Sequence, residues 1–318
     1  MANCTPLVSI GMVAYNGDEF IRQTLDSLLA QTYENFELII SDDMSTDKTQ
    51  DICLEYLARD ERIKYKRNDV NIKEVRNTNQ VFNMSTGDYF MWVADHDLYD
   101  KKFISRCVEI LDNDPSVVLC YPNTIFIDSK GNDLGIIPDH LDTRSISDAS
   151  QRFRATIPNL HRCNFINGLM RSNALRKTGL YMPVIGPDNL LLAELSLLGS
   201  FAEIPQTLFF MSQNRPDEDE IQALQRRLKN LSPNLNTTIP FTLLTLHHLI
   251  AVKNASLNLQ VKLKLMAFAL RFCNRRFGVL EELLSVANLL DVFQNARNGW
   301  RRLLSLLGLR RIKDNYIR

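Results

Sequence analysis

Two aspartates separated by one residue follow a short apolar stretch of the sequence. Residues 89–94 read Y-F-M-W-V-A, and Asp95, His96 and Asp97 come directly afterwards. Such a run is typical of a buried strand that ends in a polar loop. In extended backbone, the side chains of Asp95 and Asp97 point to the same side and can bind one cation, while the His96 side chain points to the opposite side. Carboxylates suit Mg²⁺ or Mn²⁺ with a phosphate-bearing substrate. The alternative is a solvated pair that only caps the next helix.

Polar residues also follow two earlier apolar runs. Tyr15 comes after the first run, and Asp42 and Asp43 come shortly after the second. The apolar patterns of strand and helix alternate here, at residues 7–14, 21–29, 36–40 and 52–57. This alternation predicts an α/β fold with a mainly parallel sheet, whose ligands bind beyond the carboxyl ends of the strands. We therefore expect the three polar clusters to meet in one crevice.

The later apolar patterns extend this arrangement and then change. Further strands are expected at 63–65, 117–124, 125–127, 164–171, 201–204 and 208–211, and further helices at 74–84, 100–111 and 190–198. Residues 139–155 are polar and are expected to form a loop over the site. From residue 217 the pattern is helical, at 217–231, 241–252, 257–272, 279–294 and 300–307. We expect a catalytic domain at residues 1–235 and a helical, basic region at 236–318.

The charge balance excludes one class of partner and indicates another. The 318 residues contain 37 basic and 37 acidic side chains, which gives no sign of a nucleic-acid partner. From Lys253 onward, however, the sequence contains 13 basic and 4 acidic residues. The net charge of this part is +9, and that of residues 1–252 is −9. Residues 300–311 (W-R-R-L-L-S-L-L-G-L-R-R) mix Trp, Leu and Arg in the manner of interfacial helices. An anionic membrane surface is therefore an expected partner of the C-terminal helices, and a core-packing helix with a solvated basic face is the alternative.

The cellular location follows from features that are missing. The six cysteines form no Cys-x-x-Cys pair, the N-terminus has no basic and apolar leader pattern, and no stretch has the composition of a membrane span. We expect a cytoplasmic protein with reduced thiols that is peripheral on the inner face of the membrane.

The ordered motifs resemble those of family 2 glycosyltransferases, which have the GT-A fold. The resemblance covers about the first 210 residues. It is carried by V-S-I-G-M-V-A-Y-N at 8–16, I-R-Q-T-L-D-S-L-L-A-Q-T-Y-E-N-F-E-L-I-I-S-D-D-M-S-T-D at 21–47, N-I-K-E-V-R-N at 71–77, S-T-G-D-Y-F-M-W-V-A-D-H-D at 85–97, and matching segments at 168–199. The resemblance implies an inverting transferase that uses a nucleotide-sugar donor, here UDP-linked.

The resemblance also implies roles for residues near the nucleoside. Tyr15 and one or both of Asp42 and Asp43 match positions that contact the nucleoside, where a carboxylate accepts a hydrogen bond from a base N–H. Arg76 matches a position near the base or the phosphates. A solvated charge on a helix is the alternative for Arg76.

The metal and the catalytic base are implied in the same way. Asp97 matches the principal ligand of Mn²⁺ or Mg²⁺, and Asp95 matches a residue that holds the ribose or metal-bound water. The metal would neutralise charge on the departing diphosphate. Asp188 matches the general base that takes the proton of the acceptor hydroxyl. Its position after Pro187 also fits a helix N-cap, and an N-terminal helical position favours the ionised form that a base needs.

Several residues depart from the family pattern. Met44 stands where a small residue often follows the aspartate pair, Lys73 replaces a loop glycine, and Pro187 replaces an acidic residue before the base. His96 lies in the middle of the metal motif, where it is not expected to be a ligand. No Gln-x-x-Arg-Trp motif follows Asp188, which speaks against a processive polysaccharide synthase.

Two other functions remain as alternatives to a transferase that acts on a saccharide or lipid-linked acceptor in cell-surface glycan synthesis. The first is a non-catalytic nucleotide-sugar-binding or scaffold protein, which the departures at Met44 and Lys73 favour. The second is a nucleotidyltransferase, but residues 14–17 lack the Gly-rich basic loop expected after its first strand.

Overall fold

The structure, a computed structural model, describes residues 5–128, 130–136, 140–160, 163–212 and 239–283. The chain divides into one unit of Met1–Pro183 with Pro187–Asn230 and a second unit of Val184–Gly186 with Leu231–Arg318. The predicted domain boundary at residues 235 and 236 lies outside the described residues, as do the predicted helices 217–231 and 300–307 and most of 279–294. These expectations stay predictions.

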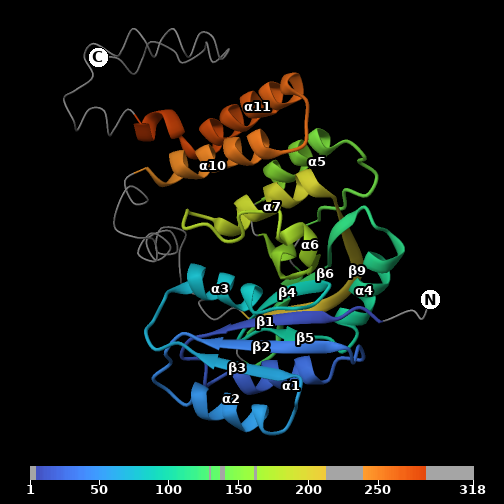
Figure 1. The fold of residues 1–318 in the computed structure, drawn as a ribbon, viewed down its shortest axis with the longest axis vertical. Coiled ribbons are helices and arrows are strands. Elements are labelled where there is room, and N and C mark those ends of the chain that lie inside the picture. Colours follow the sequence, from blue (N-terminus) through green and yellow to red (C-terminus); the bar gives the residue numbers. More distant parts are fainter. Residues whose placement is uncertain (1–4, 129, 137–139, 161–162, 213–238, 284–318) are drawn as a thin grey trace, which may run out of the picture. The chain divides into compact units, whose positions relative to one another are not determined.

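Parallel strands and crossover helices alternate through the first 94 residues, as expected. Four strands lie in the order β3-β2-β1-β4, and each neighbouring pair is parallel. The elements in chain order are β1 (Val8–Ala14), α1 (Ile21–Leu29), β2 (Phe36–Asp42), α2 (Thr49–Leu57), β3 (Ile63–Arg67), α3 (Glu74–Asn83) and β4 (Tyr89–Ala94). Helices α1 and α2 lie on one face of these strands and α3 lies on the other (Figure 1). The predicted α/β class is therefore confirmed.

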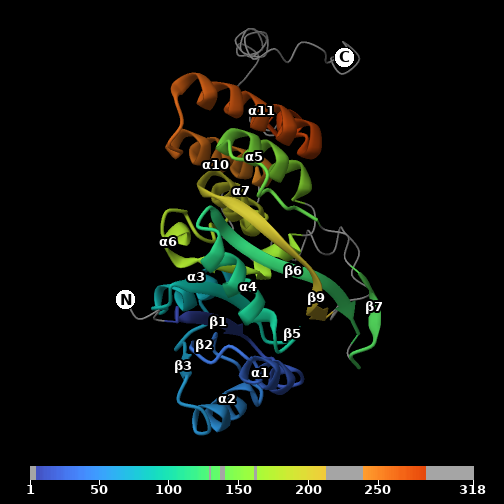
Figure 2. The same cartoon turned by 90° about the vertical axis from the view of Figure 1, so that its right-hand side faces the viewer.

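The sheet continues as a mixed sheet beyond β4. Strand β8 is antiparallel to β4 and to β6, β6 and β9 are parallel, and β5 is antiparallel to β9. The elements are β5 (Leu98–Tyr99), α4 (Phe103–Asn113), β6 (Val117–Ile127), β7 (Asp133–Ile136), α5 (Ala149–Thr156), the 3₁₀ helices η1 (Ile157–Asn159) and η2 (Asn164–Asn167), β8 (Leu169–Arg171), α6 (Ser172–Leu175), α7 (Pro187–Leu198) and β9 (Ser200–Ser212). The long strands β6 and β9 run side by side, and β7 pairs with the outer end of β6 (Figure 2).

Four local expectations were wrong. Residues 117–127 form one strand rather than two, and the two strands expected at 201–204 and 208–211 are both part of β9. Only Leu169–Arg171 of the predicted strand 164–171 is extended, because Cys163 has a left-handed backbone (φ 57°) that starts a 3₁₀ turn. The predicted polar loop at 139–155 contains α5, whose first turn is capped by the Asp148 carboxylate, which accepts the Gln151 N–H at 2.8 Å.

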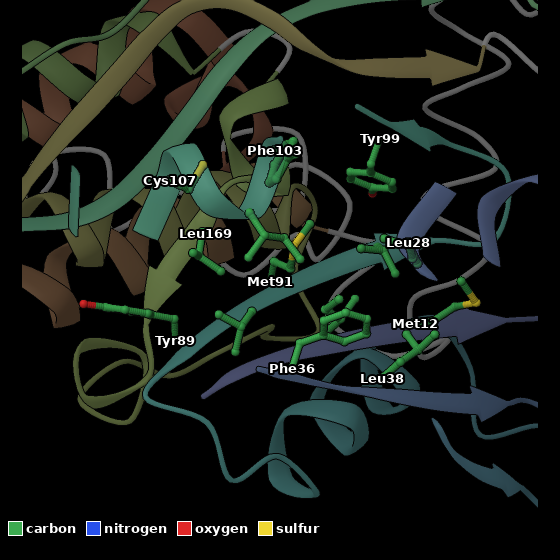
Figure 3. Packing of buried hydrophobic residues seen from close by; sticks show 14 of the residues in the cluster. Met12, Leu28, Phe36, Leu38, Tyr89, Met91, Tyr99, Phe103, Cys107 and Leu169 are labelled. Atoms are coloured by element: carbon green, nitrogen blue, oxygen red, sulfur yellow. The ribbon is translucent and has the colours of Figure 1, made fainter. Parts of the chain in front are cut away.

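The core of the first unit follows from the alternation of side chains along the parallel strands. Met12 of β1 and Leu38 of β2 point to the face of the sheet on which Leu28 of α1 and Phe103 of α4 lie (Figure 3). On the other face, Gly11 lies under α3, and a Cβ atom there would lie 2.6 Å from the Phe90 ring. Both faces of β1 are thus covered, which explains its nearly continuous apolar sequence.

A buried carboxylate joins the strands on the α3 side. Glu37 of β2 is 5% exposed. It accepts hydrogen bonds from the Ser9 hydroxyl at 2.5 Å, the Lys64 ammonium at 2.5 Å and the Thr86 N–H at 2.8 Å. Burial alone would raise the pKa of Glu37, but these donors together hold it below its ordinary value. Glu37 is therefore ionised at neutral pH and stabilises the sheet.

Replacing Glu37 by alanine is expected to lower the free energy of unfolding by about 3 kcal/mol, because it leaves several buried donors without an acceptor. Urea denaturation at pH 7 measures this loss, and Glu61→Ala, at an exposed position, is the control. Since the folded pKa is lowered, the stabilisation is present above the unfolded pKa and is lost as the pH falls through the folded pKa. A difference between wild type and Glu37→Ala that grows on acidification would contradict this assignment.

The second unit contains two helices, as predicted for 241–252 and 257–272, and they form a hairpin. Helix α10 (Pro240–Asn254) and helix α11 (Leu259–Phe277) pack against each other, and their buried residues include Leu244, Ala251, Leu265 and Ala269. Within the part of the chain that the structure describes, no helix combines the length and hydropathy needed to span a bilayer.

Candidate active site

The D-x-D motif lies in the loop between β4 and β5, and both of its carboxylates are buried. Asp95 is 9% exposed and Asp97 is 3% exposed. One oxygen of Asp95 accepts the Tyr15 N–H at 3.3 Å, and the other contacts His96 Nδ1 at 2.9 Å. Asp95 is therefore tied to the loop that follows β1. The His96 ring lies beside Asp95, so it does not point away from the motif as a simple alternation predicts.

The other end of the motif is held by β9. Asp97 Oδ1 accepts the Ser212 N–H at 2.9 Å, and the Ser212 hydroxyl donates to the His96 carbonyl oxygen. Pairing of Tyr99 with Phe209 in β5 and β9 brings these residues together. Ser212 was missed in the sequence analysis. The available signal was its place as the first polar residue after the apolar run at 208–211.

Burial makes Asp97 hard to ionise in the protein alone. Removal of the carboxyl from water raises its pKa, and the nearby negative charge of Asp95 adds to this effect. His96 and the Ser212 N–H act in the opposite direction without cancelling it. Among the described residues, no cluster of three or more His, Cys, Asp or Glu side chains can hold a metal ion. Asp95 and Asp97 nevertheless fit a hard divalent cation that takes its other ligands from water and phosphate.

The loop after β1 leaves little room beside Asp95. A Cβ atom at Gly17 would lie 2.3 Å from Asp95 Oδ2. The loop itself is fixed by side chains from the next crossover, since the Gly17 N–H donates to Thr49 Oγ1 at 2.8 Å and the Asn16 N–H donates to Ser45 Oγ at 3.0 Å. A larger residue at position 17 must therefore move the Asp95 carboxylate rather than the loop.

Gly17→Ala is expected to lower turnover by about 10²-fold while it leaves the fold intact, because a shift of about 1 Å in a positioned group has an effect of this size. The displaced atom is the end of a side chain, so the thermal melting temperature should change little. Gly179→Ala is the matched control, since the nearest atom to its Cβ would lie 3.4 Å away. Equal turnover of the two variants would show that the Asp95 position is not critical.

Asp42 and Asp43 lie at the end of β2 and brace the surrounding loops. Asp42 is fully buried and accepts the Ser45 N–H at 2.7 Å and the Tyr65 hydroxyl at 2.7 Å. Asp43 accepts the N–H groups of Ile72 at 2.7 Å and Lys73 at 2.9 Å. The two carboxylates thus shape the rim next to Tyr15, and their contact with a nucleoside stays a prediction.

Met44 and Lys73, which depart from the family pattern, have the positive φ angles that are usual for glycine. Met44 has φ 66° and Lys73 has φ 73°, and Asn16 in the loop after β1 has φ 52°. Left-handed backbone is unfavourable for ordinary residues and persists where surrounding contacts enforce it. The Asp43 carboxylate supplies such a contact at Lys73. The loop shape implied by the resemblance is therefore compatible with these two residues.

Two predicted donor-binding residues present exposed side chains. Tyr15 is 54% exposed at the end of β1. Arg76 is exposed in the first turn of α3 and forms no ion pair with any residue in the described ranges. Both side chains are thus available to a ligand, and their roles stay predictions.

Asp188 lies in the first turn of α7, and Tyr181, seven residues earlier, packs against β4 and α3. The Tyr181 ring packs edge-on against Trp92 of β4, with 5.2 Å between the centroids. The Asn79 side chain accepts the Tyr181 N–H at 3.0 Å and donates to its carbonyl oxygen at 2.9 Å. Burial raises the pKa of Tyr181, and the charges of Asp188 and then Glu74 raise it further. Asp188 therefore acts electrostatically on a residue that contacts the strand bearing the D-x-D motif.

The structure thus brings some of the predicted residues together directly. The carboxyl ends of β2, β1 and β4 are adjacent, so Asp42, Tyr15 and Asp95 lie at neighbouring strand ends. The charge of Asp188 raises the pKa of Tyr181, whose ring packs against Trp92 of β4. Arg76 stands in the first turn of α3, after the loop that Asp43 holds.

Structural comparison shows the same fold in a protein of solved structure. Residues 1–349 of TarS from S. aureus, crystallised with UDP-GlcNAc, match with a TM-score of 0.62 at 17% identity, over 85% of this chain and 73% of that one. A second crystal structure of TarS residues 1–349 matches with a TM-score of 0.61. At this level of identity the likeness concerns the fold.

Sequence comparison shows the family. An uncharacterized glycosyltransferase of Rickettsia typhi is 34% identical over 182 residues, which cover 56% of this chain and 54% of that protein. One of Haemophilus influenzae is 29% identical over 218 residues, 65% of each chain. The matched region thus spans between about half and two thirds of these relatives. The model of glycosyl transferase family 2 matches residues 9–179, more than half of the chain. The chain therefore belongs to glycosyl transferase family 2.

Proposed function

We propose that the protein is a metal-dependent, inverting glycosyltransferase. It takes a sugar from a nucleotide-sugar, UDP-linked, and transfers it to a saccharide or lipid-linked acceptor in the synthesis of cell-surface glycan. The observation that carries the proposal is the adjacency of Tyr15, Asp95 and Asp97 at the strand ends. The TarS fragment crystallised with UDP-GlcNAc has the same fold, which supports a donor of this class.

The donor end of the site is proposed to bind at the ends of β1, β2 and β4. The exposed Tyr15 ring is suited to contact the nucleoside, with Asp42 or Asp43 accepting from the base and Arg76 near the base or the phosphates. Asp97, together with Asp95, would hold Mn²⁺ or Mg²⁺. The metal, when bound, supplies positive charge that stabilises the diphosphate as it departs.

The transfer step is proposed to use Asp188 as the general base. The acceptor oxygen forms a bond to the anomeric carbon, and Asp188 takes the hydroxyl proton. The bond between that carbon and the diphosphate breaks, and its electron pair leaves with the nucleoside diphosphate. The position of Asp188 in the first turn of α7 favours its ionised form because the helix N-terminus carries partial positive charge. Attack from the face opposite the leaving group inverts the anomeric configuration.

Release of UDP or GDP from a panel of nucleotide-sugars tests the proposal. We expect release from a UDP-sugar with Mn²⁺ or Mg²⁺ and none with a chelator. Calorimetric binding of UDP without transfer or hydrolysis across the panel would instead favour a nucleotide-sugar-binding or scaffold protein. Neither binding nor release with any donor would reject both functions.

We also propose that the protein acts at the cytoplasmic face of a membrane. The support is the net charge of +9 from Lys253 onward and the Trp, Leu and Arg pattern at 300–311. Residues 300–311 lie outside the described residues. Deletion of residues 298–318 is expected to weaken co-sedimentation with anionic liposomes, and unchanged co-sedimentation would count against a role of the tail.

A further inference from the structure

Exposed aliphatic side chains are concentrated in the α10–α11 hairpin. Four of the eleven large apolar residues exposed in the described part of the chain belong to it. They are Leu246 (49% exposed), Ile250 (40%), Leu259 (70%) and Leu263 (57%). Each helix thus contributes a pair spaced four residues apart, which places the two members of a pair on one helix face.

These four residues are not needed for the packing of the hairpin itself. The buried residues of the two helices are a different set, which includes Leu244 and Ala251 of α10 and Leu265 and Ala269 of α11. A helical hairpin that faced only water would carry polar residues on its outer face. The exposed pairs therefore indicate a surface that meets an apolar environment.

Three of the exposed aliphatic residues lie close to the connection between the helices. The Asn258 side chain accepts the Val261 N–H at 2.9 Å, so α11 begins at Leu259. The Lys262 ammonium donates to the Lys253 carbonyl oxygen at 2.7 Å, which ties the start of α11 to the end of α10. Ile250, Leu259 and Leu263 thus lie within about two helical turns of the connection between α10 and α11.

This end of the hairpin carries positive charge. Residues 250–264 contain three lysines, Lys253, Lys262 and Lys264, and no acidic residue. Lys253 and Lys264 are exposed among the aliphatic residues. Lysines whose aliphatic stems lie beside exposed leucines suit the headgroup region of an anionic bilayer, where the stems are buried and the ammonium groups meet lipid phosphates. A nucleic acid would satisfy the lysines but would leave Leu259 and Leu263 in water.

We propose that the hairpin tip, defined as Ile250, Lys253, Leu259, Leu263 and Lys264, docks into the surface of an anionic membrane. The leucines enter the boundary between headgroups and acyl chains, and the lysines remain at the level of the phosphates. The hairpin tip is distinct from residues 300–311. The inference does not depend on the proposed transfer reaction, because it rests on the second unit alone.

Co-sedimentation of the full chain with vesicles tests the proposal. Wild type is expected to bind phosphatidylglycerol-containing vesicles and to bind pure phosphatidylcholine vesicles much more weakly. The double variant Leu259→Ser/Leu263→Ser is expected to lower the partition coefficient at least about tenfold. Leu54→Ser/Leu198→Ser, with leucines 43% and 40% exposed in the first unit, is the matched control and should bind like wild type.

The charge contribution has its own pair of variants. Lys253→Gln/Lys264→Gln is expected to lower the partition coefficient about fivefold for each lysine removed. Lys101→Gln/Lys102→Gln, also exposed, should leave it unchanged. Circular dichroism and the melting temperature establish that each variant is folded. All four variants keep residues 284–318, so a loss confined to the hairpin variants cannot come from the tail.

Two results would overturn the proposal. One is a Leu259→Ser/Leu263→Ser variant that remains folded and partitions like wild type. The other is a variant whose mass in sedimentation velocity differs from that of wild type while its vesicle binding is unchanged. That result would show that the exposed surface of the hairpin is a contact between copies of the chain. UDP release that is measured in solution, without vesicles, should be the same in wild type and in the hairpin variants. A failure of the proposed transferase activity would therefore be seen separately.

Discussion

Asp97→Asn is expected to abolish the proposed metal-dependent transfer and at the same time to stabilise the fold. The amide keeps an oxygen that can accept the Ser212 N–H, so the loop stays anchored to β9. The charge that a divalent cation requires is lost, and turnover is expected to fall at least about 10³-fold. Donor turnover and Mn²⁺ titration by calorimetry measure the two parts of the effect.

The gain in stability follows from the direction of the pKa shift. Burial raises the pKa of Asp97 in the folded protein. The contribution of such a group is fully present below its unfolded pKa and is lost as the pH rises through its folded pKa. Wild type without metal therefore loses stability in that range, whereas Asp97→Asn does not. A higher melting temperature for the variant near neutral pH is expected.

Asp60→Ala provides the control for loss of a paired carboxylate outside the site, since Asp60 binds Arg62 at 2.7 Å. This variant should retain metal-dependent turnover. Full metal-dependent turnover in Asp97→Asn would show that the proposed metal site is misassigned.

Asp188→Asn is expected to remove transfer while donor binding is retained. The amide has a similar shape but cannot take the acceptor proton, and loss of a general base lowers kcat by about 10²- to 10⁴-fold. The donor KM and the UDP affinity should stay close to those of wild type, because Asp188 is proposed to act on the acceptor side. Steady-state kinetics with varied donor, together with UDP calorimetry, separate the two quantities.

Glu194→Gln on the same helix is the matched control. Glu194 is a second acidic residue of α7, and its carboxylate accepts the Gly179 N–H at 2.7 Å. Burial raises the pKa of Glu194. The variant therefore measures the effect of removing a carboxylate from this helix away from the proposed base. Retained kcat in Asp188→Asn, or an equal loss of kcat in Glu194→Gln, would reject Asp188 as the base.

The parallel half of the fold could be predicted because its strands are buried on both faces. Such strands read as continuous apolar runs, and each run here is followed by a helical pattern. The strand ends could be predicted from the same pattern, which is why Tyr15, Asp42 and Asp95 were expected at one edge. Sheet order and register depend on contacts between strands, and a single sequence does not specify them.

The errors have a physical origin in particular residues. Helix α5 was missed because Arg152 reads as polar although it is buried, with its guanidinium donating to the Ser196 carbonyl oxygen at 3.0 Å. The start of β8 was missed because the left-handed backbone at Cys163 is not typical of cysteine. Ser212 was missed because it lies 115 residues from Asp97. Contacts at that separation leave no local pattern.

The anchoring of the D-x-D loop by β9 has a consequence for protein synthesis. Strands β1, β2 and β4, at whose ends Tyr15, Asp42 and Asp95 lie, are complete once residue 94 has left the ribosome, but the Ser212 contacts require 115 further residues beyond Asp97. The ends of these three strands can therefore come together in a nascent chain before the D-x-D loop is fixed. The order of emergence makes the contact of Asp97 with β9 one of the last to form during translation.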